Sequence, residues 1–308
     1  MTDRSTLVIG TRGSPLALAQ AHETQTRLMR ALGIEADALP IQVIKVMGDA
    51  IQDRPLSEAG GMGLFTKEID IAQLEGAVDI AVHSAKDLPN ELPEGLCIAG
   101  YLPREDVRDA FISPLGPRIQ DLPQGTRVGS ASLRRQAMIR RLRPDLDVAL
   151  MRGNVNTRLA KLERGEYGAT LLALAGLKRL GLEHHVTTVL DTDEFLPAVG
   201  QGAIAITTRV GDERAREAAS GIIDEATGIA LAAERAFLRV LDGSCRTPIA
   251  GYARVTGGKV SFRGMVLRPD GSQSVETAAT GTSGDAGRLG TEAGHEVRDR
   301  IPPGFFTA

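Results

Sequence analysis

Aromatic residues and cysteines are scarce in this sequence. Its 308 residues include no tryptophan and only 3% aromatic residues, which argues against a stacking platform for nucleic-acid bases. The two cysteines are too few for a disulfide framework in a chain of this length, and such usage fits a reducing compartment. We therefore expect a cytoplasmic protein that binds no nucleic acid.

Several other patterns are also missing. No apolar run approaches the roughly 20 residues of a membrane-spanning helix, so we expect no membrane association. The chain contains no glycine-rich phosphate loop ending in lysine, and Gly10-Thr11-Arg12-Gly13 lacks the spacing of a dinucleotide-binding turn. The five histidines form no pair at the spacing of a metal site, and we predict no metal ligands.

The composition is otherwise that of an ordinary globular protein, with 42% hydrophobic and 24% charged residues, and the length fits two or three domains. In the N-terminal part, short apolar runs alternate with helical patterns, which predicts an α/β layer with mostly parallel strands. We expect strands at 7–10, 39–46, 80–83 and 96–101, and helices at 14–32 and 64–75. Ser14 and Pro15 are typical of a helix start. The polar, glycine-containing stretch 48–63 predicts a mobile loop or lid.

The same alternation then repeats. We expect strands at 127–129, 147–151 and 169–173, with helices at 132–142, 155–164 and around 177–180. Strands at 249–255, 260–267 and 274–279, joined by hairpin-type turns and followed by a helix near 287–300, indicate a small antiparallel sheet. The predicted fold class is therefore α/β, with two lobes and a small C-terminal α+β domain with a three-stranded antiparallel sheet.

Positive charge is concentrated in the second lobe. Residues 127–164 carry a local excess of +7 in a chain whose net charge is -3. Arginines follow several predicted strands, where ligands of α/β folds usually bind, and a guanidinium pairs with a carboxylate in bidentate fashion. We infer an anionic ligand with several carboxylates or phosphates. Arg140, Arg141 and Arg143 are instead assigned to a solvated face.

Two predicted loops carry residues whose side chains could take part in catalysis or ligand binding. Cys245 follows a helical pattern that ends at Asp242-Gly243, and Arg246 beside it favours the thiolate. Taken alone, a single cysteine such as Cys245 is better explained as a small residue packed under a loop. Ser84, Lys86 and Asp87 lie together after a predicted strand; alone, they fit a capped turn with an exposed lysine.

Six segments that occur in one order give the chain its resemblance to a known family. They are HSAKDLP at 83–89, GSASLRR at 129–135, RGNV at 152–155, AGLKRL at 175–180, AVGQG at 198–202 and the loop around Cys245. Together they resemble the porphobilinogen deaminases, also called hydroxymethylbilane synthases. The likeness runs from Ile9 to the Cys245 loop and, more weakly, to the C-terminus.

The resemblance implies an architecture and an activity. The architecture is two lobes like those of periplasmic binding proteins, with the active site in the cleft between them, and a third domain that carries the Cys245 loop. The implied domains are 1–102 with 200–220, 103–199, and 221–308, because the chain returns to the first domain near 204–208. The activity is tetrapolymerisation of porphobilinogen into hydroxymethylbilane with release of ammonia, in tetrapyrrole biosynthesis, by a monomer.

The resemblance also implies residue roles. Cys245 carries a dipyrromethane cofactor through a thioether, and Asp87 is the catalytic carboxylate. The other positions that match cofactor binding are Ser84, Lys86, Ser132, Arg134, Arg135, Arg158 and Arg179, and Asp87 shares this role. The positions that match substrate binding or lie in matching motifs near the cleft are Arg12, Arg152, Phe65 and Gln201. Many relatives carry lysine in the loop 60–63, where this chain has Met62, and Glu58 adds a negative charge nearby.

This chemistry agrees with the residues. Each pyrrole carries an acetate and a propionate, so the growing chain gains two negative charges per step, which suits a cleft lined with arginine. Loss of ammonia from porphobilinogen leaves a cation that a carboxylate stabilises, and Asp87 is the candidate. Two alternatives stay open. A cysteine-dependent hydrolase or transferase would need a histidine near Cys245, and an anion-binding protein without chemistry would need neither Asp87 nor Cys245.

Overall fold

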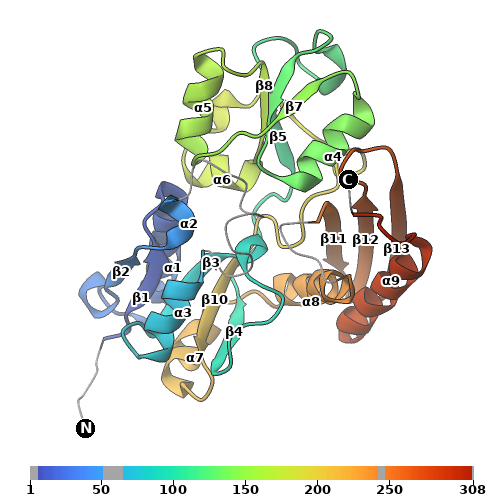
Figure 1. Cartoon of the computed structure of the whole chain (residues 1–308). Helices are drawn as coiled ribbons and strands as arrows, with labels where there is room; N and C mark the ends of the chain where they lie inside the picture. Colours follow the sequence, from blue (N-terminus) through green and yellow to red (C-terminus); the bar gives the residue numbers. More distant parts are fainter. Residues whose placement is uncertain (1–5, 51–64, 242–246, 307–308) are drawn as a thin grey trace. The chain divides into compact units, whose positions relative to one another are not determined.

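The structure, a computed structural model, describes residues 6–50, 65–241 and 247–306 (Figure 1). Contacts group the chain into two units. Unit 1 comprises Met1–Glu105 and Ala203–Gly228, and unit 2 comprises Asp106–Gly202 and Ile229–Ala308. The division into three domains stays a prediction, and each unit is described here by itself.

Unit 1 contains a five-stranded mixed sheet of order β2-β1-β3-β10-β4. Strands β1 (Ile9–Arg12), β2 (Ile41–Ile44) and β3 (Ile80–Ser84) are parallel. Strand β10 (Ile204–Arg209) runs antiparallel to β3 and to β4 (Leu96–Tyr101). The chain therefore returns to the first sheet at the segment that the family resemblance implied.

Helices cover both faces of this sheet. Helices α1 (Pro15–Leu32) and α7 (Glu213–Ser220) share an apolar core with one face, and α3 (Lys67–Leu74) packs on the other through Ile69 (Figure 1). The predicted start of α1 is confirmed, because Ser14 accepts a hydrogen bond from the backbone N–H of Ala17 at 3.3 Å and Pro15 is the first helical residue.

The first sheet of unit 2 repeats this strand order as β7-β6-β8-β5-β9. Strands β6 (Arg127–Gly129), β7 (Asp147–Ala149) and β8 (Ala169–Ala173) are parallel, and β5 (Asp109–Ile112) is antiparallel to β8 and to β9 (Thr188–Val189). The helices that follow the three parallel strands are α4 (Leu133–Leu142), α5 (Val155–Glu163) and α6 (Leu174–Arg179).

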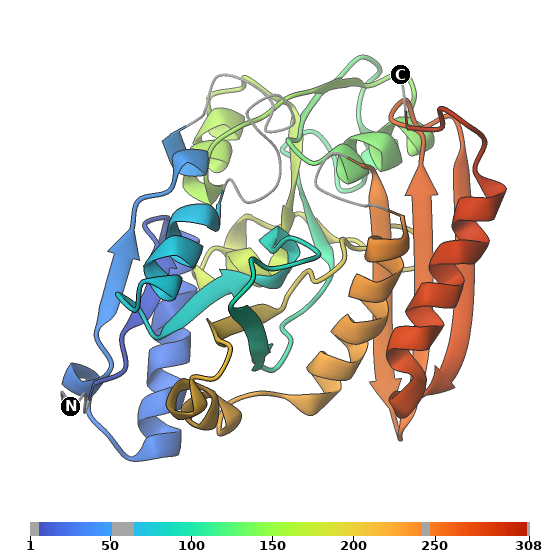
Figure 2. The same ribbon diagram turned by 60° about the horizontal axis from the view of Figure 1, so that its bottom comes forward.

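The second sheet of unit 2 is antiparallel, with β11 (Ile249–Thr256), β12 (Lys259–Leu267) and β13 (Ser274–Thr282). Helices α8 (Glu225–Val240) and α9 (Ala286–Arg300) pack on one face of it (Figure 2). The other face shares a core with the α/β lobe, because Met265 and Leu267 pack in the same cluster as Phe111 and Leu196. Side chains alternate along β12, so this strand contributes residues to the cores on both faces of the sheet.

The predicted fold class is confirmed by these three sheets. Two strands were missed, β5 and β9, because they are only four and two residues long, and β5 also follows a proline-containing segment. The predicted strand 39–46 is also too long, since the chain leaves β2 after Ile44 and forms the short helix α2 (Met47–Ala50). Residues 51–63 of the predicted lid, with Glu58 and Met62, and the Cys245 loop lie outside the described residues.

Helices α8 and α9 approach each other closely at one glycine. A Cβ atom added at Gly290 would lie 2.0 Å from the backbone oxygen of Ala233, far inside van der Waals contact. We expect Gly290→Ala to force the helices apart and to lower the free energy of unfolding by about 1–3 kcal/mol, as overpacking typically does. Thermal unfolding of the purified variant measures this.

Gly287 in the same helix provides the matched control. A Cβ atom there would meet nothing within 4 Å, so Gly287→Ala should be neutral or stabilise by up to about 1 kcal/mol through helix propensity. Equal melting temperatures for the two variants would contradict the close-packing argument.

Candidate active site

The predicted site residues follow the ends of parallel strands in both α/β sheets. In unit 1, Arg12 ends β1 and Ser84 ends β3; in unit 2, Ser132 follows β6 and Arg152 follows β7. Parallel strands in one sheet place their carboxyl ends at one edge, which is where α/β folds bind ligands. Each unit therefore brings its own set of predicted residues together.

In unit 1, an arginine, a carboxylate and an aromatic ring are neighbours. Arg12 Nη1 lies 3.9 Å from Asp87 Oδ2, and Arg12 Cζ lies 4.1 Å from the centroid of the Phe65 ring. The side chain of Asp87 is 36% exposed, so the carboxylate is accessible to a ligand. The ring of Phe65 supports the guanidinium by a cation–π contact, which restrains it beside the carboxylate.

The residues before Asp87 are tied down. Ser84 Oγ and the side-chain amide of Gln20 lie within hydrogen-bonding distance at 2.9 and 3.1 Å, and the backbone N–H of Ala85 donates to Ala203 O at 3.0 Å. The segment Ala85–Asp87 is a single 3-10 turn. It presents Lys86 and Asp87 at the surface from a fixed base.

In unit 2, Arg134 and Arg135 both bind one carboxylate, that of Asp109 on β5. Arg134 Nη2 donates to Asp109 Oδ2 at 2.7 Å, and Arg135 Nε and Nη2 donate to Oδ1 at 3.0 and 2.6 Å. Gln201 Nε2 also donates to Oδ1, at 3.1 Å. The side chains of Asp109, Arg134 and Arg135 are 0%, 4% and 6% exposed, so this cluster is buried.

The cluster has one positive charge more than its carboxylate can neutralise. Burial alone raises the pKa of Asp109, but the charges and hydrogen bonds of Arg134 and Arg135 outweigh burial and lower it from 3.8 to about 2. The cluster therefore stabilises the fold above pH 3.8, and this contribution is lost as the pH falls through about 2. Within the described residues, Arg134 Nε is buried without a hydrogen-bond partner. A buried excess charge with a spare donor favours an anionic ligand.

The sequence did not point to Asp109, because it begins the missed strand β5. The run Asp109-Ala110-Phe111-Ile112 is a weak strand signal, four residues long, between proline-containing segments. Gln201 was predicted from its motif, and the structure places it in this cluster with Nε2 also donating to Val107 O at 2.7 Å.

The other predicted residues of unit 2 lie at helix starts and strand ends. Ser132 Oγ accepts from the backbone N–H of Arg135 at 3.4 Å and caps α4. Arg158 Nε donates to Gly153 O at 2.9 Å, and Arg179 Nη1 donates to Gly202 O at 3.2 Å.

The loop after β7 depends on a glycine. Gly153 has φ +114°, and a Cβ atom there would lie 2.6 Å from Thr157 Cγ2, so the turn requires glycine. Asn154 caps α5 by accepting from the backbone N–H of Thr157, and Lys161 Nζ donates to Arg152 O at 3.2 Å. The loop that carries Arg152 is thereby held on both sides.

The prediction of a solvated basic face is wrong for two of its three arginines. Arg143 Nη1 donates to three backbone oxygens of residues 119–122, and its other nitrogens bind Asp145. Arg140 donates to Pro269 O at 2.9 Å and to Val148 O at 3.3 Å, so it ties α4 to the C-terminal sheet and to β7. Only Arg141 is exposed, where it pairs with Glu276.

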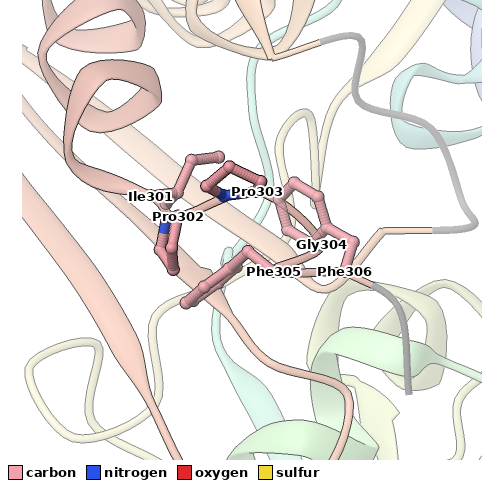
Figure 3. Close-up of a pocket in the computed structure, with 6 residues that line it drawn as sticks. All are labelled: Ile301, Pro302, Pro303, Gly304, Phe305 and Phe306. Atoms are coloured by element: carbon pink, nitrogen blue, oxygen red, sulfur yellow. The ribbon is translucent and has the colours of Figure 1, made fainter.

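Other features of the described chain do not resemble a catalytic site. A hollow of about 460 Å³ is lined by the six residues 301–306, none of which is titratable (Figure 3). Within residues 6–50, 65–241 and 247–306, no group of three His, Cys, Asp or Glu side chains is arranged to hold a metal ion. In the same ranges, no helix is both long and apolar enough to cross a bilayer.

The buried cluster makes a stability prediction. Asp109→Asn leaves two buried guanidinium groups without their counter-charge, which we expect to lower the free energy of unfolding by about 3–5 kcal/mol. Glu276→Gln, the same chemical change in the exposed pair with Arg141, should lower it by about 0–1 kcal/mol. Denaturant unfolding at pH 7 measures both, and similar losses would argue against a buried charge cluster.

Comparison with known proteins agrees with the family resemblance of the sequence motifs. Residues 7–217 match the profile described as "Porphobilinogen deaminase, dipyromethane cofactor binding domain", and residues 229–299 match "Porphobilinogen deaminase, C-terminal domain". The porphobilinogen deaminase of Nitrobacter hamburgensis is 58% identical over 97% of this chain and 95% of its own length. That of Nitrobacter winogradskyi is 57% identical over the same shares. Among solved structures, the methionine-binding protein MetQ has a TM-score of 0.45 with 12% identity, covering 72% of this chain and 89% of that chain.

Proposed function

The chain belongs to the porphobilinogen deaminase family, and we propose that it joins four molecules of porphobilinogen into hydroxymethylbilane, releasing ammonia at each addition. It is accordingly a transferase of tetrapyrrole biosynthesis. The family match over both parts of the chain carries this conclusion. The buried excess of positive charge around Asp109 supports it, because porphobilinogen and its products carry an acetate and a propionate on every pyrrole.

The family's dipyrromethane cofactor fits the residues present. A group with four carboxylates suits a unit that holds several guanidinium groups at the carboxyl ends of its strands, one of them with a spare buried donor. When bound, this cofactor supplies the pyrrole to which porphobilinogen units are joined. We assign its attachment to Cys245, which lies outside the described residues, on the motif alone.

The arginine residues of unit 2 would bind the carboxylates in two ways. Arg134 and Arg135 are buried and held by Asp109, so they act mainly through their net charge and the spare Nε of Arg134. The half-buried side chains of Arg152, Arg158 and Arg179 are more accessible and would make direct bidentate contacts. Ser132 at the start of α4 adds the positive end of a helix.

In unit 1, Asp87 would stabilise positive charge. Porphobilinogen that has lost ammonia is a cation at its methylene carbon and ring nitrogen, and an adjacent carboxylate lowers the energy of that cation. Asp87 is exposed enough to accept a pyrrole N–H and is fixed by the turn behind it. Four neighbouring residues would bind the substrate's own carboxylates and ring. Ser84 and Lys86 precede Asp87 in the chain, and Arg12 lies beside its carboxylate with the ring of Phe65 behind it.

Some finer points belong to the same proposal. The three domains predicted at 1–102 with 200–220, 103–199 and 221–308 would each contribute residues, with Cys245 on the third. We propose a cytoplasmic location, which the sparse cysteines support. We also propose that the protein is a monomer. Size-exclusion chromatography with light scattering tests the monomer.

Intact-mass measurement tests the function directly. The purified protein should exceed the mass of its sequence by two condensed porphobilinogen units, and porphobilinogen should produce species with further units. Cys245→Ser should fold but carry no added mass, because a hydroxyl is a poorer nucleophile than a thiol or thiolate. An unmodified mass in protein that consumes porphobilinogen would contradict the covalent cofactor.

Asp87→Asn separates an enzyme from an anion-binding protein. The substitution keeps the shape of the side chain and removes the charge that would stabilise the cation. We expect porphobilinogen consumption to fall by at least about 10²–10⁴-fold in protein supplied with preassembled cofactor. Because the ligands are anions, their binding should not weaken. Unchanged turnover with a lowered melting temperature would contradict the catalytic role and show that Asp87 only caps the turn.

A further inference from the structure

His83 lies buried behind the turn that presents Asp87, and the roles proposed above do not use it. It is on β3, and its residue is 5% exposed. In the register of the sheet it pairs with Ala205 of the antiparallel strand β10, two residues from Thr207. Its Nε2 atom lies 3.3 Å from Thr207 Oγ1, on the face of the sheet that α3 covers.

The hydrogen bonds around Thr207 determine which ring nitrogen of His83 carries the proton. Gln73 Nε2 donates to two backbone oxygens, Asp79 O at 3.2 Å and Thr207 O at 2.7 Å. Carbonyl oxygens cannot donate, so the amide orientation is fixed and Gln73 Oε1 must be an acceptor. The single hydroxyl proton of Thr207 is therefore donated to Gln73 Oε1, at 2.9 Å.

Thr207 Oγ1 must then accept from His83. The imidazole carries its proton on Nε2, and Nδ1 has a lone pair. The ring is also neutral, because burial, and next the charge of Arg12, lower the pKa of His83 from 6.5 to about 4. Arg12 thus lies beside a neutral ring, and its guanidinium pairs with the carboxylate of Asp87.

We propose that His83 is a positioning residue for the Asp87 turn, acting as a neutral imidazole whose Nε2–H anchors β3 to Thr207. The proposal rests on the proposed function, since it concerns how Asp87 is held for catalysis. His83 would not touch the reacting atoms.

The anchor adds a buried side-chain contact to the backbone ladder that joins β3 to β10 just before the turn. Besides that ladder, the contacts before Asp87 include His83 to Thr207, Ser84 to Gln20, and Ala85 N–H to Ala203 O. Two of these reach β10 and its preceding residue, so the turn is fastened to one strand. Loss of the His83 contact would leave the backbone ladder in place but remove its side-chain support next to the turn, and displacements of the Asp87 turn of about 1 Å can cost up to 10²-fold in rate.

A pair of amide variants tests this anchor. Glutamine places its amide nitrogen the same number of bonds from Cβ as histidine places Nε2, so His83→Gln should still donate to Thr207 and keep kcat within about threefold. Asparagine is one bond shorter and cannot reach, so His83→Asn should lose at least about tenfold in kcat. KM for porphobilinogen should stay within about threefold in both, with cofactor loading checked by intact mass.

Substitutions at Thr207 test the same contact from the other side. Thr207→Ser keeps the hydroxyl and should keep kcat, whereas Thr207→Val removes it and should reproduce the loss seen in His83→Asn. If both residues act through one contact, the double variant with His83→Asn and Thr207→Val should be no slower than the worse single variant.

Val82 provides the control for simple destabilisation. It neighbours His83 on β3 but points to the opposite face of the sheet, into the core with α1 and α7. Val82→Ala should lower the melting temperature while kcat stays unchanged. Nitrogen-15 NMR of labelled histidine at pH 7.5 should show His83 neutral and protonated on Nε2.

The outcomes separate the proposal from its premise. Wild-type protein that does not consume porphobilinogen would contradict the proposed function. If wild type is active, three results would each overturn the role of His83: unchanged kcat in His83→Asn, equal losses in His83→Gln and His83→Asn, or a ring protonated on Nδ1.

Discussion

The second unit holds two guanidinium groups against one buried carboxylate, and much of its architecture follows from this excess of charge. A buried charge is tolerated only where it is paired and hydrogen-bonded, so the N–H donors of Arg134 and Arg135 need acceptors from several elements. Beyond Asp109, they bind Leu196 O and Leu171 O. The cluster therefore fastens α4 to β5, to β8 and to the segment before Gln201.

In the role proposed above, two such adjacent arginines would favour a bound anion without contacting it fully. Their side chains are immobile and nearly inaccessible, so they contribute a fixed charge that costs no reorganisation when a ligand binds. Flexible arginines at the surface would lose rotamer freedom on binding, which weakens their net contribution. Arg152, Arg158 and Arg179 are half-buried. Arg158 and Arg179 each donate one hydrogen bond to a backbone oxygen, that of Gly153 and that of Gly202.

Local structure was largely predictable from the sequence, and side-chain partners were not. The cap at Ser14, the strand Leu96–Tyr101 and the C-terminal hairpins follow from turn residues and apolar spacing within a few positions. The partner of Arg134 lies 25 residues earlier, in a strand of four residues that no periodicity could reveal. The prediction of a solvated basic face was wrong for the same reason. Nothing near Arg143 in the sequence shows its backbone acceptors, which lie more than 20 residues earlier in the chain.

The two units meet opposite electrostatic demands with different buried chemistry. Unit 2 keeps a net positive charge in its interior, which suits anionic ligands. Behind Asp87, unit 1 instead buries a neutral set of Gln73, Thr207 and His83, each satisfied by the next. A further charged group there would change the electrostatic balance that Arg12 and Asp87 set, whereas a neutral set fixes the turn without adding charge. In the role proposed for Asp87, burial that holds the His83 ring neutral would therefore help a single exposed carboxylate to stabilise a cation beside anionic ligands.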